Sequence, residues 1–340
     1  MVSAIQDGLL GYNPTWLAPA VSEATAAFQK KRFGWDLDPK AVRVAPAVLP
    51  ALEAMIQYLV RPGSPVVVPT PAYMPFLTIP PALGHSVIEV PSLHGEAYPG
   101  GWTLDLDGIK AGLEAGAGLV ILCNPWNPVG RVLTEAEMRA LQELVSHYDA
   151  LVFSDEIHSP LVLGGRDFVS YARMGAEFAS HTITATAATK GWNIAGLPNA
   201  QVIIPDEGLR ERWDSICQEK LPHSMSTIGA LGSIEAYTNG DEWQREIFEV
   251  IECNIRAVSE ALASTKIDFH PPQATYLTWW GFEAYPQFGD SPASVLLERA
   301  HIAVNAGITL GADYSKWARM NLACPPKVAE EMLSRVVEML

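Results

Sequence analysis

The feature that most constrains the fold of this chain is a series of seven short, mainly apolar runs. Several of them are hydrophobic throughout instead of alternating with polar residues, which predicts strands buried on both faces. Helical patterns lie between many of the runs, and this alternation predicts a mostly parallel α/β sheet over residues 40–220. The runs cover residues 42–45, 65–69, 86–91, 118–125, 150–156, 181–187 and 200–205.

The clearest helix is expected over residues 134–149. Thr134 can cap its first turn, and Glu137, three residues later, completes the pattern of a capping box. Apolar residues recur at helical spacing and predict one buried face. These residues are Met138, Leu141, Leu144 and Val145.

The pattern changes after residue 224, and the chain is expected to be mostly helical from there to residue 265. The segments after residue 265 predict a second, smaller α+β unit. We therefore expect a large domain over residues 1–240 and a small C-terminal domain over residues 241–340. These later segments are residues 275–282, a helix near 291–300, residues 308–311, residues 318–325 and a C-terminal helix.

Charge and composition exclude several classes of partner. The net charge of -15 argues against nucleic acid and anionic membranes, because both attract clustered Lys and Arg. No apolar run reaches the roughly 18 residues of a membrane span, and the first residues, with Asp7 and no basic segment, do not form a signal-peptide pattern. We expect reduced thiols in the cytoplasm, because no C-x-x-C pair or zinc-site spacing occurs. The cysteines are Cys123, Cys217, Cys253 and Cys324.

Lys190 is the single lysine in the stretch of residues 184–203, which is rich in small and β-branched residues. One interpretation is a solvated ammonium group in a surface loop. The other is a lysine in dry surroundings, which loses its proton easily and can form an imine.

Asp155 comes at the end of a predicted buried strand, in the segment SDEIHSPL. The carboxyl ends of strands are where open α/β sheets bind ligands. Asp155 and Glu156 are either a helix cap and a solvated carboxylate, or part of a site in which Asp155 holds a positive ring nitrogen. In the second interpretation His158 reaches the same ring.

Asn127 and Arg319 are the other polar candidates. Asn127 lies in the loop CNPWNPVG, which its two prolines and glycine make rigid. The loop is either only a turn or a support that fixes the amide as a hydrogen-bond donor.

Arg319 lies in the apolar segment ARMNLACP, and a buried arginine needs an anion. That anion is either an internal Asp or Glu or a substrate carboxylate, which arginine can clamp bidentately.

Together these motifs resemble the fold-type I pyridoxal-phosphate (PLP) enzymes of the aminotransferase class I/II superfamily. Within them, they resemble the cystathionine β-lyase group related to MalY and PatB. The resemblance spans essentially the whole chain and implies a large domain with a mostly parallel seven-stranded sheet plus a smaller α+β C-terminal domain. The matching segments are TPAYMPF, CNPWNPVGRV, SDEIHSPLV, TATAATKGWNIAGL and RMNLACP, in this order.

The resemblance implies roles around the cofactor ring. Lys190 is similar to the catalytic Schiff-base lysine, and Asp155 to the carboxylate on the pyridine nitrogen. An ionised Asp keeps that nitrogen protonated, and the protonated ring withdraws electrons from the substrate Cα. Asn127 and His158 match partners of the phenolic oxygen of the ring.

The resemblance also implies contacts outside the ring edge. Tyr73 matches the aromatic residue that stacks on the ring, although without the family pattern it reads as a core tyrosine. Arg319 matches the arginine that holds the substrate α-carboxylate. Tyr12 matches a tyrosine that binds the phosphate of the partner subunit in a homodimer. From the residues alone, Tyr12 reads as a surface aromatic.

A phosphate is expected at a helix start, where backbone N–H groups lack partners. Residues 42–58 predict a strand, a turn and a helix, and Pro50 suits the first helical turn. Thr189 can add a hydroxyl group. The residues at the matching backbone positions are Ala47, Val48 and Leu49.

This chain departs from the family pattern in three places. Ala187 stands where many relatives have Ser, so one phosphate hydroxyl is expected to be missing. Trp126 stands where His or Gln is common, so a more apolar pocket mouth is expected. Relatives carry a further segment near the substrate, upstream of residues 8–12, and the chain is expected to begin in the helix after it.

The resemblance implies a carbon–sulfur β-lyase that converts cystathionine or another S-substituted L-cysteine to a thiol, pyruvate and ammonia. Lys190 would remove the Cα proton as general base before a thiolate leaves from Cβ. Two alternatives stay open. An aminotransferase shares the steps up to proton removal, and a regulatory protein that has lost activity would keep the fold.

Overall fold

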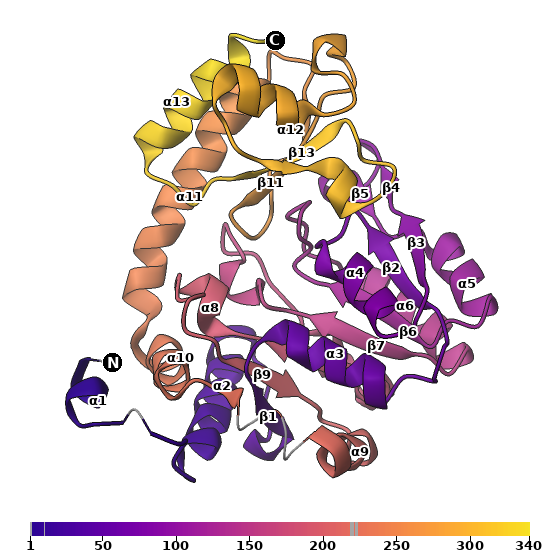
Figure 1. Cartoon of the computed structure of the whole chain (residues 1–340), viewed down its shortest axis with the longest axis vertical. Helices are drawn as coiled ribbons and strands as arrows, with labels where there is room; N and C mark the ends of the chain where they lie inside the picture. The colour runs from indigo at the N-terminus through magenta and orange to yellow at the C-terminus, as the bar shows by residue number, and fades with distance from the viewer. Residues whose placement is uncertain (1, 10, 218–220, 222–223) are drawn as a thin grey trace.

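The computed structural model describes residues 2–9, 11–217, 221 and 224–340. Its main sheet has the strand order β1-β9-β8-β7-β6-β2-β3. Neighbours from β8 to β3 pair in parallel, whereas β9 pairs antiparallel with both β8 and β1. The seven predicted runs and the mostly parallel sheet are therefore confirmed (Figure 1). The strands are β1 (Val42–Ala45), β2 (Val66–Thr70), β3 (Val87–Pro91), β6 (Leu119–Cys123), β7 (Leu151–Asp155), β8 (Thr182–Thr186) and β9 (Ala200–Ile203).

Helices cover both faces of this sheet. Val66 and Val68 pack in one core cluster with α3 and α9, while Val67 packs in another with α5 and α6. Successive strand residues point to opposite faces of a sheet. Val66, Val67 and Val68 are all buried, so this strand needs apolar residues on both of its faces. The helices are α1 (Val2–Gln6), α2 (Leu17–Phe33), α3 (Val48–Tyr58), α4 (Pro75–Ala82), α5 (Leu106–Glu114), α6 (Glu135–His147), α7 (Ala176–Ala179), α8 (Ala188–Gly191), α9 (Glu207–Cys217), α10 (Thr227–Asn239), α11 (Asp241–Leu262), α12 (Pro292–Val295) and α13 (Pro326–Val337).

A second sheet, of order β10-β11-β13-β12, has only antiparallel pairs. Its strands are β10 (Asp268–Phe269), β11 (Leu277–Gly281), β12 (Asn305–Ala306) and β13 (Trp317–Asn321). Side chains of α11 and α13 form one core cluster with it, and Figure 1 shows α11 running up to it beside the main sheet. We propose the boundary between a large and a small domain where α10 ends and α11 begins.

Two details of the small domain depart from a regular pattern. The helix expected near 291–300 begins as α12 and continues as a π-helical turn over Leu296–Ala300. The segment 308–311 lies mostly in a 3-10 helix, Gly307–Leu310, directly after β12. Within the part of the chain that the structure describes, no helix is both long enough and apolar enough to cross a lipid bilayer.

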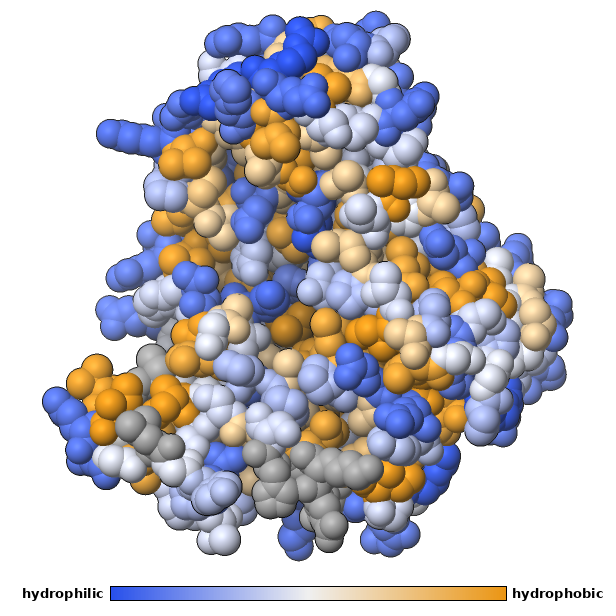
Figure 2. Space-filling model, in the orientation of Figure 1, coloured by the Kyte–Doolittle hydropathy of each residue, from blue (hydrophilic) through white to orange (hydrophobic). Residues whose placement is uncertain are grey.

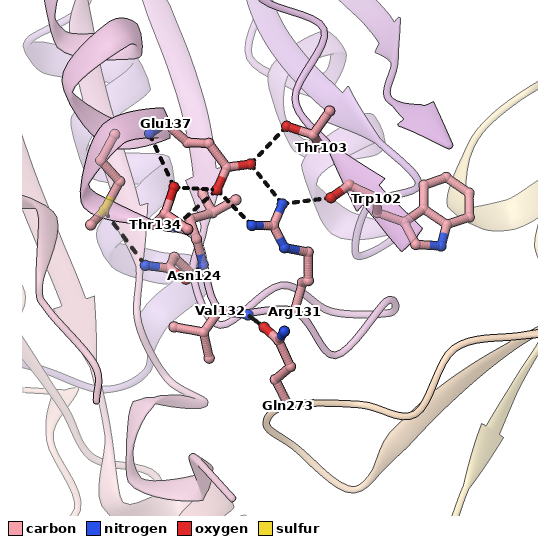
Figure 3. Close-up of polar contacts among 10 residues, drawn as sticks. Trp102, Thr103, Asn124, Arg131, Val132, Thr134, Glu137 and Gln273 are labelled. Carbon is pink, nitrogen blue, oxygen red and sulfur yellow. Dashed lines mark hydrogen bonds and ion pairs between the residues drawn. The ribbon is translucent and has the colours of Figure 1, made fainter. Parts of the chain in front are cut away.

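The predicted capping box at the start of α6 is present, and it belongs to a larger buried network (Figure 3). Thr134 Oγ1 accepts a hydrogen bond from the Glu137 N–H at 3.2 Å. The Glu137 carboxylate also accepts two bonds of 2.6 Å from Arg131, whose side chain is almost fully buried. Arg131 further donates to the Trp102 carbonyl, and Thr103 donates to Glu137. The network therefore fixes the loop between β6 and α6.

Glu137→Gln is expected to destabilise the protein at neutral pH. Burial alone would raise the pKa of Glu137, but hydrogen bonds from Arg131, Thr103 and Thr134 outweigh it and lower the pKa to about 2. The stabilisation is therefore complete above pH 4.5, the ordinary pKa, and is lost as the pH falls toward 2. The shift corresponds to about 3 kcal/mol.

Urea unfolding of both proteins, measured as a function of pH, tests this prediction. The free energy of unfolding should differ by about 3 kcal/mol at pH 7, and the difference should shrink below pH 4.5. A difference that stays constant at low pH would contradict an ion pair as its cause.

Candidate functional site

A cavity of about 350 Å³ lies at the edge of the main sheet where the parallel strands end. Ten of the eleven residues predicted from the sequence line it, and they come from segments of both the main sheet and the four-stranded sheet. This is the edge at which open α/β sheets bind ligands. The ten residues are Ala47, Val48, Leu49, Tyr73, Asn127, Asp155, His158, Thr189, Lys190 and Arg319.

The sheet topology explains why side chains from distant segments meet here. Tyr73 follows β2, Asn127 follows β6, Asp155 ends β7 and Lys190 follows β8. These four strands are parallel, so their ends share one edge. β1 runs in the same direction because two antiparallel pairings separate it from β8, which brings Ala47 to the same edge.

A larger hollow of about 1170 Å³ lies elsewhere, between α2, α11 and the segment 162–169. Its walls carry opposite charges, including the ion pair of Lys31 and Asp241, which is exposed. Exposed ion pairs are strongly solvated and contribute little. We place the functional site in the smaller cavity because buried polar groups converge there from two sheets.

Asp155 is a buried acid in the wall of the cavity. Its Oδ1 accepts a hydrogen bond of 3.0 Å from the backbone N–H of Ile157. Burial raises the pKa of Asp155 to about 6, although that hydrogen bond and the charge of Lys190 lower it in part. A cation bound beside Asp155 would favour its ionised form.

Two buried polar atoms on residues of the cavity wall have no hydrogen-bond partner among the described residues: Nδ1 of His158 and Nδ2 of Asn199. Burial, together with the charges of Lys190 and Arg319, lowers the pKa of His158 to about 3, so its imidazole is neutral. A buried polar group without a partner costs about 1–3 kcal/mol.

Arg319 reaches the cavity from β13. Its Nη1 donates to Asn127 Oδ1 at 3.0 Å, and its Nε and Nη2 donate to Asn305 Oδ1 at 3.2 and 2.7 Å. Both partners are neutral amides, and no carboxylate of the described chain forms an ion pair with Arg319. The sequence left open whether Arg319 pairs with an internal Asp or Glu or with a substrate carboxylate. The geometry favours the substrate carboxylate.

The start of α3 forms another wall. Ala47 precedes the helix, and Val48 and Leu49 are its first residues. N–H groups in a first helical turn lack partners within the helix and bind anions such as phosphate. Thr189 lies on the same wall as Ala187, which offers no hydroxyl group, as expected from the sequence.

Two aromatic residues lie outside this cavity. Trp126 does not form the pocket mouth, so that expectation is wrong: its side chain is buried in the core, and its Nε1 donates to the Pro71 carbonyl at 2.9 Å. Tyr12 is fully exposed and does not line the cavity of its own chain. Its predicted role in a partner subunit stays a prediction.

Sequence reasoning missed Tyr276, Asn199 and Asn321, which also line the cavity. No sequence motif marks Tyr276 or Asn321. The pairing of Leu277 with Asn321 brings Tyr276 beside the arginine strand. β9 runs antiparallel to β8, so its starting end lies at the ligand edge and brings Asn199 there.

Comparison with known proteins assigns this arrangement to a family. Residues 3–336 match the family described as aminotransferase class I and II. The chain is 31% identical to cystathionine β-lyase of Corynebacterium glutamicum, over 100% of this chain and 88% of that protein. It is 29% identical to cystathionine β-lyase PatB of Bacillus subtilis, over 98% and 85%.

A solved structure shows the same architecture. Cystalysin of Treponema denticola, which contains a pyridoxal 5'-phosphate cofactor, superimposes with a TM-score of 0.90 at 26% identity, over 99% of this chain and 86% of that one. The structure thus has the fold-type I transferase fold. The chain belongs to the aminotransferase class I and II family.

Proposed function

We propose that this protein is a PLP-dependent carbon–sulfur β-lyase, which cleaves cystathionine or a related S-substituted L-cysteine to a thiol, pyruvate and ammonia. The observation that carries the proposal is the convergence of Lys190, Asp155 and Arg319 on one cavity. The cystathionine β-lyases to which the chain is similar support the choice of reaction.

The cavity fits PLP. Its volume of about 350 Å³ suits a small cofactor with part of a substrate. The start of α3 and Thr189 would hold the phosphate, and Asp155 the pyridine nitrogen. Asn127 and His158 would contact the phenolic oxygen, and Tyr73 the ring face.

When bound, PLP supplies an electron sink for negative charge at the substrate Cα. Asp155 provides the negative charge that keeps the ring nitrogen protonated. Arg319 holds the α-carboxylate, which fixes the amino acid near Lys190. The Lys190 amine would take the proton from Cα, the electron pair of that bond would form the Cα=Cβ double bond, and the thiolate would leave Cβ with the electron pair of the C–S bond. Water would then convert the released aminoacrylate to pyruvate and ammonia.

The products of the reaction distinguish a lyase from an aminotransferase. With L-cystathionine, we expect pyruvate release to outrun amino transfer to 2-oxo acids, because a thiolate on Cβ is a good leaving group. Rapid amino transfer from alanine or aspartate, without pyruvate from cystathionine, would assign an aminotransferase. A purified protein that stays colourless after incubation with PLP would support a regulatory role instead.

Arg319→Ala is expected to raise KM for L-cystathionine about 10- to 100-fold, because charge-assisted bonds contribute about 1.5–3 kcal/mol each. The cofactor content should not change. Arg256→Ala, which removes an exposed arginine of α11, is the matched control. Loss of cofactor with unchanged substrate affinity would make Arg319 a structural residue.

We further propose that the protein acts as a cytoplasmic homodimer. Cys123, Cys253 and Cys324 are free thiols, which supports a reducing compartment. Figure 2 shows hydrophobic side chains gathered over α1 and the segment after it. The exposed apolar residues of this N-terminal segment support a subunit interface. They are Val2, Ile5, Tyr12 and Trp16.

Subunit mixing tests the assignment of Tyr12 to the partner's phosphate. Tyr12→Phe homodimers should bind PLP more weakly, and Lys190→Ala homodimers should be inactive. A mixed dimer holds one site with both defects and one with neither. Recovery of near wild-type PLP affinity at a portion of the sites is expected. No recovery, in a sample shown to contain mixed dimers, would exclude a contribution of Tyr12 to the partner's site.

A further inference from the structure

Three side chains that commonly bind metal ions meet outside the cavity, where a hairpin touches the small domain. The hairpin consists of β4 (Leu93–His94) and β5 (Trp102–Thr103). His94 Nε2 lies 3.2 Å from Asp268 Oδ2, and His270 Nε2 lies 3.6 Å from Asp268 Oδ1. One ligand atom from each residue lies within 4.8 Å of the other two. None of these residues lines the proposed PLP site.

The fold holds these side chains in place from both sides. His94 pairs with Trp102 across the hairpin, and their rings pack at 4.3 Å. Asp268 lies in β10, and His270 is two residues further along, a spacing that places both on one face of an extended chain. The His270 ring packs against Gly101, where an added Cβ atom would lie only 2.3 Å from the ring.

We propose that His94, Asp268 and His270 bind a divalent ion of the zinc class and link the hairpin to the four-stranded sheet. A tetrahedral zinc ion with bonds of about 2.0–2.1 Å requires donor atoms about 3.3 Å apart. His94 Nε2 and His270 Nε2 lie 3.3 and 3.6 Å from the same oxygen, Asp268 Oδ1, and these separations are close to this value. The three donor atoms lie at most 4.8 Å apart, so side-chain rotation would bring them to this spacing.

The composition of the cluster selects the type of ion. Two imidazoles and a carboxylate suit zinc, cobalt, nickel or copper, whereas magnesium and calcium prefer oxygen ligands. Water can occupy the fourth position.

A simple hydrogen-bonded cluster is the alternative explanation, because each histidine already lies near Asp268. The two explanations differ in their response to metal. The Asp268 side chain is 35% exposed and that of His94 28%, so an ion from solution can reach both. Because 174 positions of sequence separate His94 from Asp268, an ion held by both stabilises the folded chain.

Calorimetric titration of the untagged, PLP-loaded protein with zinc chloride tests the proposal. We expect one ion per chain and a rise in the melting temperature with zinc but not with magnesium. His94→Phe keeps an aromatic ring against Trp102, and Asp268→Asn keeps the side-chain shape; each should weaken zinc binding at least tenfold. His147→Ala, which removes an exposed histidine of α6, is the control and should bind like the wild type.

Two results would overturn the proposal. One is a wild-type protein that binds no zinc at millimolar concentration. The other is binding that persists unchanged in both variants, which would place the ion elsewhere, for example at the cofactor phosphate. Metal-free melting curves and circular dichroism identify a misfolded variant, and the other variant then decides the outcome.

Discussion

Lys190→Ala is expected to lower the rate of pyruvate release from L-cystathionine by at least about a thousandfold, because it removes both the covalent anchor and the general base. The lysine lies in the short helix α8, directly after β8, and lines the cavity beside Asp155. No second lysine among the described residues lines this cavity. The loss should therefore not be compensated from within the described site.

Borohydride reduction and subsequent peptide mass spectrometry check the assignment independently of activity. The PLP adduct is expected on the peptide that contains Lys190 in the wild type, and it should be absent from the Lys190→Ala protein. Lys110→Ala, which changes an exposed lysine of α5, should keep both the adduct and the activity. An adduct on any other lysine would refute the proposed role of Lys190.

Asp155→Asn is expected to bind PLP but to lose activity by about a hundredfold or more, a loss of roughly 3 kcal/mol in transition-state stabilisation. A neutral amide has no charge with which to keep the ring nitrogen protonated. Steady-state rates and the cofactor content of both proteins measure the effect. Turnover close to that of the wild type would remove Asp155 from the proposed mechanism.

Stability without the cofactor distinguishes this loss from misfolding. Burial raises the pKa of Asp155 from 3.8 to about 6. Because the pKa of Asp155 is raised in the folded state, its protonated form stabilises the fold fully below pH 3.8, and this stabilisation is lost as the pH rises through 6. At pH 8 the free energy of unfolding is lower by about 3 kcal/mol as a result. Asparagine avoids this cost, so PLP-free Asp155→Asn should melt at the same or a higher temperature than the PLP-free wild type at pH 8.

The sequence predicts the main sheet well because most of its strands are buried on both faces. Several of these strands, for example Val66–Thr70, are mainly apolar, and turn residues or a helix separate each from the next. The segment 308–311 is harder to predict, because four residues, some apolar and some polar, are too few to show the hydrophobic period of a helix or a strand. Its 3-10 conformation depends on packing: a Cβ on Gly307 would lie 2.0 Å from the Tyr314 carbonyl oxygen.

The candidate site is predictable where residue chemistry is unusual for its position. A lone lysine and a carboxylate at strand ends, or an arginine within an apolar strand, attract notice in the sequence. Tyr276 and Asn199 are ordinary residue types, and only the three-dimensional pairing of strands brings them to the cavity. Similarly, local sequence does not show whether Trp126 points to a ligand or into the core.

The cavity draws its walls from two different sheets. The residues proposed to bind PLP come from the large domain, whereas Arg319, Tyr276 and Asn321 belong to the small domain. Backbone hydrogen bonds join the two near the cavity, among them the bonds from the Gln273 and Ala274 N–H groups to the Gly130 carbonyl at 2.8 and 2.9 Å. Substrate preference can therefore diverge during evolution by changes in the small domain alone, and a chimaera that keeps these contacts should inherit the specificity of its small-domain donor.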